Sequence, residues 1–209
     1  MNYQSNDTAI RDAKPDDLET VTDVLAEAFL HGDLGPWLIP HLDTRHKVYV
    51  PYFEMLAQHA IEYGHVEITD EAPAVAIWYT VAGGRQPAIH GYDTRLREIT
   101  GKYYRRFVEM DRAMGEHHPR DQWHQYLAFL AVDPEHQGRG LGSALLKHHH
   151  AELDQAGTPS FLEATGTRNR HLYTRHGYLP RPTYRLSPDG PQLYPLWRPA
   201  APHQTAGQS

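Results

Sequence analysis

The chain has 209 residues, enough for one ample hydrophobic core but too few for two large domains. Its 20 lysines and arginines against 26 aspartates and glutamates give a formal charge of -6, so no overall basic field attracts nucleic acid or an anionic membrane. The absence of cysteine excludes disulfides, thiolate metal sites and a cysteine nucleophile.

The first third of the chain predicts one strand and two helices. Residues 8–12 are typical of a short strand, and Pro15 followed by two aspartates marks a helix start, where acidic side chains suit the helix dipole. One face of this helix is apolar: Leu18, Val21, Leu25 and Ala28. Gly32 ends it, and a stretch rich in glycine and proline leads to a second helix over 44–63, which Pro51 begins or kinks.

The middle of the chain predicts two strands and one long helix. Residues 65–69 and 74–80 are expected strands, the second (AVAIWYT) apolar enough for a sheet interior, and 82–87 is a loop. From 94 to 118 we expect a single amphipathic helix that continues through Gly101. Its apolar positions recur at helical spacing: Leu96, Ile99, Tyr103, Phe107, Met110 and Met114.

The C-terminal half begins with seven unbroken apolar residues at 126–132 (YLAFLAV), which predict the central strand, covered on both faces. The elements expected after it are a helix to about 155, a strand over 160–164, a helix over 168–176 and strands over 178–186 and 193–198. Residues 199–209 lack periodicity and are expected to be a disordered tail after one domain over 1–198. This order implies an α/β domain with helices on both faces of a mixed sheet.

Between the central strand and its helix, glycines at 138, 140 and 142 remove Cβ atoms where the chain must approach a ligand. The following helix directs free N–H groups and its positive dipole end at the loop, which favours a phosphate; a glycine-rich turn without a ligand is the alternative. A Walker loop is excluded because no Lys-Ser/Thr pair follows the glycines. A dinucleotide fold is disfavoured because 133–137 separate strand from glycines and Ser143 breaks G-x-G-x-x-G, although Glu163 stands where a ribose-binding acid belongs.

Residues 137–142 have the form Q-x-x-G-x-G and follow V-x-P at 132–134. This resembles the pyrophosphate-binding motif of the GCN5-related N-acetyltransferases, and 161–178 (FLEATGTRNRHLYTRHGY) resembles the second motif of that family. Together the motifs cover roughly the C-terminal half, and within the family they look most like puromycin-type and other antibiotic or small-molecule acetyltransferases. The resemblance implies a mixed, largely antiparallel sheet of six to seven strands, splayed at the cofactor site, with helices on both faces.

The resemblance also implies acetyl-CoA as the cofactor. Main-chain amides of 138–143 would bind its pyrophosphate, and the strand end at 130–132 would pair with its pantetheine arm as a neighbouring strand. An N–H near Leu130 would stabilise the oxyanion, Asn169 would bind the arm, and Tyr173 would protonate the leaving thiolate. The implied cofactor-binding residues are Leu130, Ala131, Val132, Gln137, Gly138, Arg139, Gly140, Leu141, Gly142, Ser143, Asn169 and Tyr173.

The base that deprotonates the acceptor amine is left open between Glu163, His124 and water. Family architecture places the acceptor among aromatic and acidic residues, although core packing explains most of them equally well: Asp33, Trp37, Tyr49, Tyr52, Phe53, Tyr103, Tyr104 and Phe107. Three functions follow: an N-acetyltransferase for a small amine such as an antibiotic or toxic metabolite, a protein or peptide acetyltransferase, and a non-catalytic acyl-CoA-binding regulatory module.

Sixteen histidines, three of them consecutive at 148–150, invite a metal interpretation. Consecutive helical residues point about 100° apart and cannot converge on one ion, and H-E-x-x-H does not occur, so we expect a solvated histidine face and no metal site. The polar N-terminus and the lack of any run of about 18 apolar residues predict a soluble, cytoplasmic protein without membrane or nucleic-acid partners, as monomer or homodimer.

Overall fold

The computed structural model describes residues 9–70, 73–84 and 86–201. Within these ranges eight strands form one mixed sheet, ordered β1-β2-β3-β4-β5-β8-β6, with β7 paired to β8. The strands are β1 (Ile10–Asp12), β2 (His65–Thr69), β3 (Ala74–Val81), β4 (His124–Val132), β5 (Ser160–Ala164), β6 (Leu179–Pro180), β7 (Tyr184–Arg185) and β8 (Gln192–Arg198). Only β4 and β5 pair in parallel, and the other strand pairs within the described residues are antiparallel.

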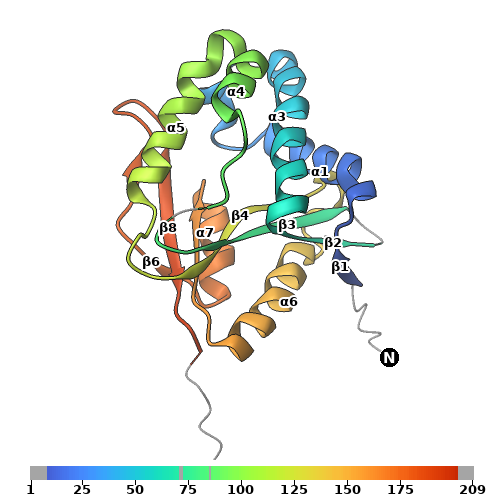
Figure 1. The fold of residues 1–209 in the computed structure, drawn as a ribbon, viewed down its shortest axis with the longest axis vertical. Helices are drawn as coiled ribbons and strands as arrows, with labels where there is room; N and C mark the ends of the chain where they lie inside the picture. Colours follow the sequence, from blue (N-terminus) through green and yellow to red (C-terminus); the bar gives the residue numbers. More distant parts are fainter. Residues whose placement is uncertain (1–8, 71–72, 85, 202–209) are drawn as a thin grey trace, which may run out of the picture.

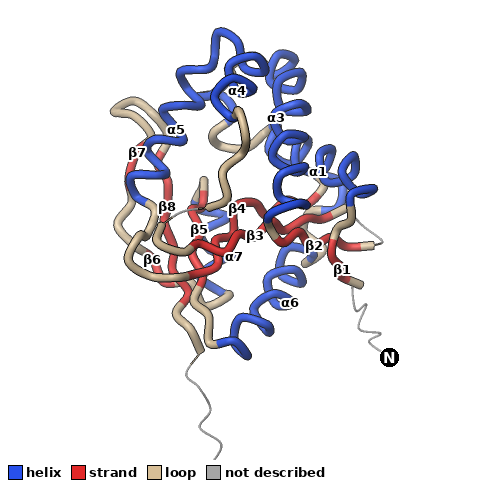
Figure 2. The backbone as a smooth tube through the Cα atoms, in the orientation of Figure 1, coloured by secondary structure: helices blue, strands red, loops and turns tan. Residues whose placement is uncertain are grey.

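Helices cover both faces of this sheet (Figure 1, Figure 2). The α-helices are α1 (Leu18–Leu30), α2 (Gly35–Leu38), α3 (Leu42–Tyr63), α4 (Tyr92–Thr100), α5 (Tyr104–His117), α6 (Leu141–Ala156) and α7 (Thr167–Arg175). One core cluster packs α1, α3 and α5 on one face of the sheet, and a second packs α6 and α7 on the other. No described helix is long and apolar enough to cross a membrane.

Strand β3 shows why an almost unbroken apolar run lies between these two layers. Its alternate residues Val75, Ile77 and Tyr79 join the cluster with α1 and α3, whereas Ala76 and Trp78 join the cluster with α6. Each of these side chains is buried because both faces of the strand are covered. The prediction of an interior strand here is confirmed.

The expected long helix over 94–118 is broken, and that prediction is wrong. α4 ends at Thr100, a 3-10 turn covers Gly101–Tyr103, and α5 begins at Tyr104. Gly101 has φ +51, a conformation that side chains with a Cβ rarely adopt, so the helix stops there. The apolar spacing therefore continues across two helices with different axes.

Three further differences are smaller. The stretch 178–186 forms two short strands, β6 and β7, instead of one, which raises the strand number to eight. Pro51 lies inside α3, which begins at Leu42, and α2 occupies part of the expected loop. The histidine face is not solvated as predicted, because His149 and His150 are buried against Trp78 and Tyr178. Most of the expected disordered tail, 202–209, lies outside the described residues.

β4 changes its register halfway along the strand, and its pairing on the two sides is unequal. Opposite β3, Ile77 pairs with Phe129 and Trp78 with Leu127, so Ala128 is the extra residue of a β-bulge. Opposite β5, only Gln125 and Tyr126 have partners. Beyond Tyr126 the two parallel strands therefore separate, and the sheet opens into a slot.

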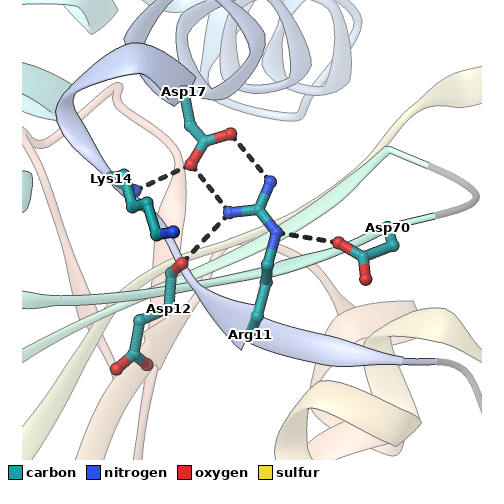
Figure 3. A network of polar contacts seen from close by, with 5 residues as sticks. All are labelled: Arg11, Asp12, Lys14, Asp17 and Asp70. Atoms are coloured by element: carbon teal, nitrogen blue, oxygen red, sulfur yellow. Dashed lines mark hydrogen bonds and ion pairs between the residues drawn. The ribbon is translucent and has the colours of Figure 1, made fainter.

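The N-terminal strand is fixed by a cluster of charges around Arg11 (Figure 3). The guanidinium donates to both carboxylate oxygens of Asp17 at 2.7 and 2.8 Å and to Asp70 at 2.8 Å. Arg11 holds the pKa of Asp17 well below its usual value, helped by a bond from the Lys14 main chain. The cluster joins β1 to the turn before α1 and to the end of β2.

Candidate active site

The slot between β4 and β5 continues into a cavity of about 400 Å³, which we call the central cavity. Its wall combines α1, α3, α5 and α7 with β4, β5 and the connection between β3 and α4. Most of the lining is aromatic or aliphatic, including Phe29, Tyr49, Tyr52, Phe53, Met110, Met114 and Phe129. Three carboxyl groups (Asp33, Asp111 and Glu163) lie among these residues, and no lysine or arginine does in the described part of the wall.

Glu163 on β5 is the most enclosed of these carboxyl groups. Tyr126 of β4 donates a hydrogen bond to its Oε2 at 3.1 Å, and Tyr184 of β7 donates to its Oε1. Burial raises the pKa of Glu163 to about 7, although both tyrosine hydroxyls act in the opposite direction. The side chain thus exists in both protonation states near neutral pH, as a general base requires.

Asp111 on α5 forms a second polar position in the cavity. Tyr92 of α4 donates to Asp111 Oδ2 at 2.9 Å, and burial raises the pKa of Asp111 to about 6. Tyr52 of α3 lies beside Tyr92, and burial holds its pKa well above the usual value. At pH 7 Asp111 is therefore mainly ionised, and neutral phenols surround it.

Tyr173 on α7 lies on the cavity wall next to the slot. Burial raises its pKa well above 10, so its hydroxyl stays protonated at any pH at which the protein works. The structure gives this hydroxyl no hydrogen-bond partner among the described residues, although the ring packs edge-on against Tyr178. Asn169, one helical turn earlier, is exposed and lines the mouth of the same cavity.

The glycine loop lies where β4 meets α6, as predicted. Gly138 and Gly140 have φ +80 and +87, and nothing lies within 4 Å of the positions their Cβ atoms would take. Gly140 is the N-cap of α6, a helix of 16 residues, so free N–H groups and the positive dipole end meet at this loop. Gln137 fastens the loop to the strand by donating to the Val132 carbonyl at 3.2 Å.

The loop and the cavity are joined through β4. A Cβ on Gly142 would be 3.6 Å from the side chain of Leu130, which lines the cavity. The edge of β4 from Leu127 to Val132 that faces β5 has no strand partner in the described chain. One continuous path therefore leads from the helix N-terminus along an unpaired strand edge to Glu163.

His124 does not line the central cavity, unlike the other two predicted catalytic residues. It is fully buried behind His118, with Nδ1 2.8 Å from the Gln122 carbonyl and Nε2 3.2 Å from His118 Nε2. His118 does line the cavity, and burial lowers its pKa to about 4, with His124 and Arg120 acting in the same direction. Neither imidazole accepts a proton readily at neutral pH.

Only some of the predicted acceptor residues line the central cavity. Asp33, Tyr49, Tyr52 and Phe53 line the cavity, but Trp37, Tyr103 and Tyr104 do not. Arg106 covers the Trp37 ring, and Lys102 and Arg97 lie over the rings of Tyr103 and Tyr104. Phe107 is buried in the core against Tyr52.

Sequence reasoning missed Asp111, Tyr126 and His118. Asp111 carried a detectable signal, since it lies within the apolar stripe of α5, beside Met110 and a turn before Met114. A carboxylate on such a stripe needs a partner or a function. Tyr126 and Tyr184 could not be found in this way, because both contact Glu163 only through the pairing of β4, β5 and β8.

Comparisons with known proteins agree with this arrangement. Residues 103–180 match the family described as "Acetyltransferase (GNAT) domain". The chain is similar to the solved structure of a histone acetyltransferase HPA2 and related acetyltransferase from Corynebacterium glutamicum, with 27% identity and a TM-score of 0.72 over 94% of this chain and 98% of that one.

Two more distant structures share the fold alone. The ribosomal-protein-S18-alanine N-acetyltransferase from Escherichia coli is 19% identical with a TM-score of 0.55, covering 97% of this chain and 99% of that chain. The arylalkylamine N-acetyltransferase 2 from Aedes aegypti is 14% identical with a TM-score of 0.60, covering 93% and 99%.

Proposed function

The chain is a GNAT N-acetyltransferase, and on that premise we propose that it acetylates the primary amine of a small molecule by direct attack in a ternary complex with acetyl-CoA. The observation that carries the acceptor class is the central cavity, with three carboxyl groups and no described lysine or arginine on its wall. Its volume of about 400 Å³ lies within the range of about 300–1,000 Å³ for small-molecule sites. A compact amine with an apolar or aromatic body, cationic in solution, suits such a cavity.

The residues present fit acetyl-CoA, which when bound supplies the acetyl thioester. The open, left-handed positions at Gly138 and Gly140 leave the N–H groups of the first turn of α6 accessible to a pyrophosphate. The unpaired edge at 127–132 offers main-chain donors and acceptors to an extended arm with amide groups. An N–H of this edge near Leu130 would stabilise the negative charge that develops on the acyl oxygen.

Glu163 is the proposed base. An alkylammonium must lose a proton before its nitrogen can attack, and a carboxylate with a pKa of about 7 is well matched to accept it near neutral pH. The hydroxyls of Tyr126 and Tyr184 orient the carboxylate from two strands. His124 and water remain the alternatives, and burial of His124 lowers its pKa and weakens it as a base.

Tyr173 is the proposed acid. Its hydroxyl is protonated, lies on the cavity wall beside the slot and has no competing partner in the described chain. It can therefore donate to the departing thiolate, whose pKa of about 8.5 is too high for rapid departure without a donor. Asn169 at the cavity mouth would bind the arm of the cofactor.

A protein or peptide amine is the second candidate acceptor. The aromatic lining contributed by α3, α5 and the connection before α4 makes a concave pocket, which suits a small molecule better than a polypeptide. An antibiotic or toxic metabolite as acceptor remains a prediction from the sequence. A module that binds acyl-CoA without turning it over would need neither a perturbed Glu163 nor an unpaired Tyr173.

Calorimetric binding of acetyl-CoA, with NAD and ATP as controls, tests the cofactor. We expect binding of acetyl-CoA alone by the wild type, and loss of that binding in Gly140→Trp. Gly101→Trp is the matched control, because Gly101 also has a positive φ and open space, but lies away from the loop. Equal loss in both variants would mean that backbone strain, and not a blocked site, explains the effect.

Turnover is then measured as thiol release with a panel of arylalkylamines, diamines, aminoglycosides and peptides with free N-termini. We expect kcat/KM to be highest for a small amine. A peptide that exceeds every small amine would establish the second candidate, and binding of acetyl-CoA without turnover of any amine would favour the regulatory module.

A further inference from the structure

A second cluster of chemically active side chains lies on the face of the sheet opposite the central cavity. Strand β2 contributes His65 and Glu67, and helix α6 contributes His149. One ligand atom from each residue lies within 4.8 Å of the others. We propose that these three residues form a binding site for a divalent transition-metal ion, with Zn²⁺ as the preferred ion.

The separations between the ligand atoms fit coordination to one ion. His149 Nδ1 and His65 Nε2 lie 3.1 and 3.4 Å from the same oxygen, Glu67 Oε1. Two ligands about 2.0–2.1 Å from a tetrahedral zinc are about 3.3 Å apart. The two nitrogen–oxygen separations therefore need shifts of only a few tenths of an ångström, whereas the two histidine nitrogens, which lie within 4.8 Å of each other, must approach to about 3.3 Å.

His65 provides a second geometric observation. Its Nε2 is buried and lies between Glu67 Oε1 at 3.4 Å and Asp12 Oδ1 at 3.5 Å, yet it has no aligned hydrogen bond to either carboxylate. This nitrogen lies close to two carboxylate oxygens without an aligned hydrogen bond to either. Ligand atoms around a common metal ion have the same arrangement, because each of them points at the ion and not at its neighbours.

Contacts behind the ligands fix their orientation. Trp78 of β3 donates from Nε1 to Glu67 Oε2 at 3.3 Å, which leaves Oε1 to face the histidines. The same indole stacks on the His149 ring, with centroids 4.0 Å apart and planes inclined by 14°. Hydrogen bonding of the carboxylate and packing of the imidazole are typical of the outer shell of a metal site.

The donor set selects the type of ion. Two imidazoles and one carboxylate match Zn²⁺ and related transition metals, whereas Ca²⁺ and Mg²⁺ prefer oxygen ligands alone. Glu67 is fully buried, and an ionised carboxylate there needs hydrogen bonds or a nearby cation to offset the loss of water. A bound Zn²⁺ would satisfy it together with both histidines.

The cluster also has an entrance and a source of a fourth ligand. His65 and His149 line a second cavity, with Glu152 on the same wall. At the edge of the cluster, Asp12 Oδ1 lies 3.5 Å from His65 Nε2, and the Asp12 carboxylate points away from the charges around Arg11 (Figure 3). His148 Nε2 lies 3.9 Å from Glu67 Oε1. Asp12 or a water molecule can complete four-coordination, whereas His148 stays outside the set of ligands.

The expectation that consecutive histidines cannot share an ion still applies, but the proposed site uses only one of the three. His149 is turned into the protein, and its co-ligands come from β2, with Glu67 82 residues earlier in the chain. An ion here would clamp α6 to β2, so its effect is on stability. The proposal is independent of the proposed acyl transfer.

Cobalt binding to untagged, chelator-stripped full-length protein tests the site. We expect one Co²⁺ per chain with the visible absorption of a four- or five-coordinate ion, displaced by Zn²⁺, and a Zn²⁺-dependent rise in Tm. Glu67→Gln and His65→Gln should each weaken binding at least about 100-fold, because even loss of an outer-shell partner costs about 10- to 100-fold.

His46→Gln is the matched control. His46 Nε2 also lies 3.1 Å from a glutamate, Glu27, but no third ligand from the described residues joins that exposed pair, so the variant should bind cobalt as the wild type does. Absence of a stoichiometric cobalt spectrum in the wild type would overturn the proposal and leave an ion-pair cluster around Glu67. Binding retained in both Glu67→Gln and His65→Gln would overturn it too, because the ion would then bind elsewhere. The wild-type spectrum decides the question even if a variant does not fold.

Discussion

Replacing Glu163 by glutamine removes the proposed base while keeping a side chain that both tyrosines can hydrogen-bond. With a pKa of about 7, the carboxylate is ionised in about one tenth of the molecules at pH 6 and in about nine tenths at pH 8. For an amine that arrives as an ammonium, kcat/KM of the wild type should rise tenfold per pH unit below 7 and level off above it. Glu163→Gln should lose about 10²–10³-fold at pH 8 and show no break near pH 7.

The assay is continuous detection of released thiol, and the cysteine-free chain adds no background of its own. If water acts as the base on an amine that enters neutral, kcat/KM rises steadily toward the pKa of the amine, about 10 for an alkylamine, without a break near 7. That profile, shared by wild type and Glu163→Gln, would refute the assignment. Equal losses at all pH values with the break retained would show that Glu163 only supports the pocket.

The raised pKa of Glu163 also predicts that the free energy of unfolding of the wild type falls with pH, over the range in which activity rises. Because burial raises the folded-state pKa from 4.5 to about 7, proton binding favours the folded state, and this contribution is complete below pH 4.5 and lost as pH rises through 7. The shift corresponds to about 3 kcal/mol. In urea denaturation, the free energy of unfolding of the wild type should therefore fall by about this amount, relative to that of Glu163→Gln, between pH 4.5 and pH 8. A difference that stays constant with pH would contradict the raised pKa.

Three other substitutions test separate parts of the molecule. Tyr173→Phe should lower kcat about 10²-fold with little change in acetyl-CoA affinity, measured by steady-state kinetics and calorimetry, and an unchanged kcat would remove the tyrosine from the mechanism. Asp111→Asn should raise KM for a cationic amine about tenfold and leave kcat nearly constant, because it removes negative charge from the cavity but does not touch the reacting atoms. An unaltered KM would mean that the amine does not reach α5. Leu145→Ala, in the fully buried core between α6 and the sheet, should cost about 2–5 kcal/mol in urea denaturation, and a loss below about 1 kcal/mol would show that this core repacks freely.

The fold was predictable where local signals and tertiary structure agree. Strands 65–69 and 160–164 have the predicted bounds because apolar runs lie between clear turn residues. The helix break at Gly101 was not predictable from periodicity, since the apolar spacing runs on across it and only the backbone angle reveals the stop.

The residues of the candidate site were also predictable only where a local motif marks them. Gly138, Gly140, Asn169 and Tyr173 follow contiguous motifs; Asn169 and Tyr173 line the central cavity, and Gly138 and Gly140 lie in the loop between β4 and α6. Residues that depend on the approach of separate elements were less accessible: Trp37 and Tyr104 have the right composition for an acceptor pocket, but cation–π contacts hold them elsewhere. The cluster of His65, Glu67 and His149 has no sequence signature, because β2 and α6 meet only in the folded sheet.

The bulge at Ala128 and the parting of β4 from β5 also bear on solubility. A strand edge without partners normally invites pairing with another molecule, and proteins oppose this with charges, prolines or covering segments placed along the edge. Here the unpaired edge is an internal one, with β5 and β8 beyond it, so another chain cannot align with it from outside. An edge hidden in the middle of the sheet can keep an apolar sequence such as YLAFLAV and stay open to a slender ligand, without becoming a seed for aggregation.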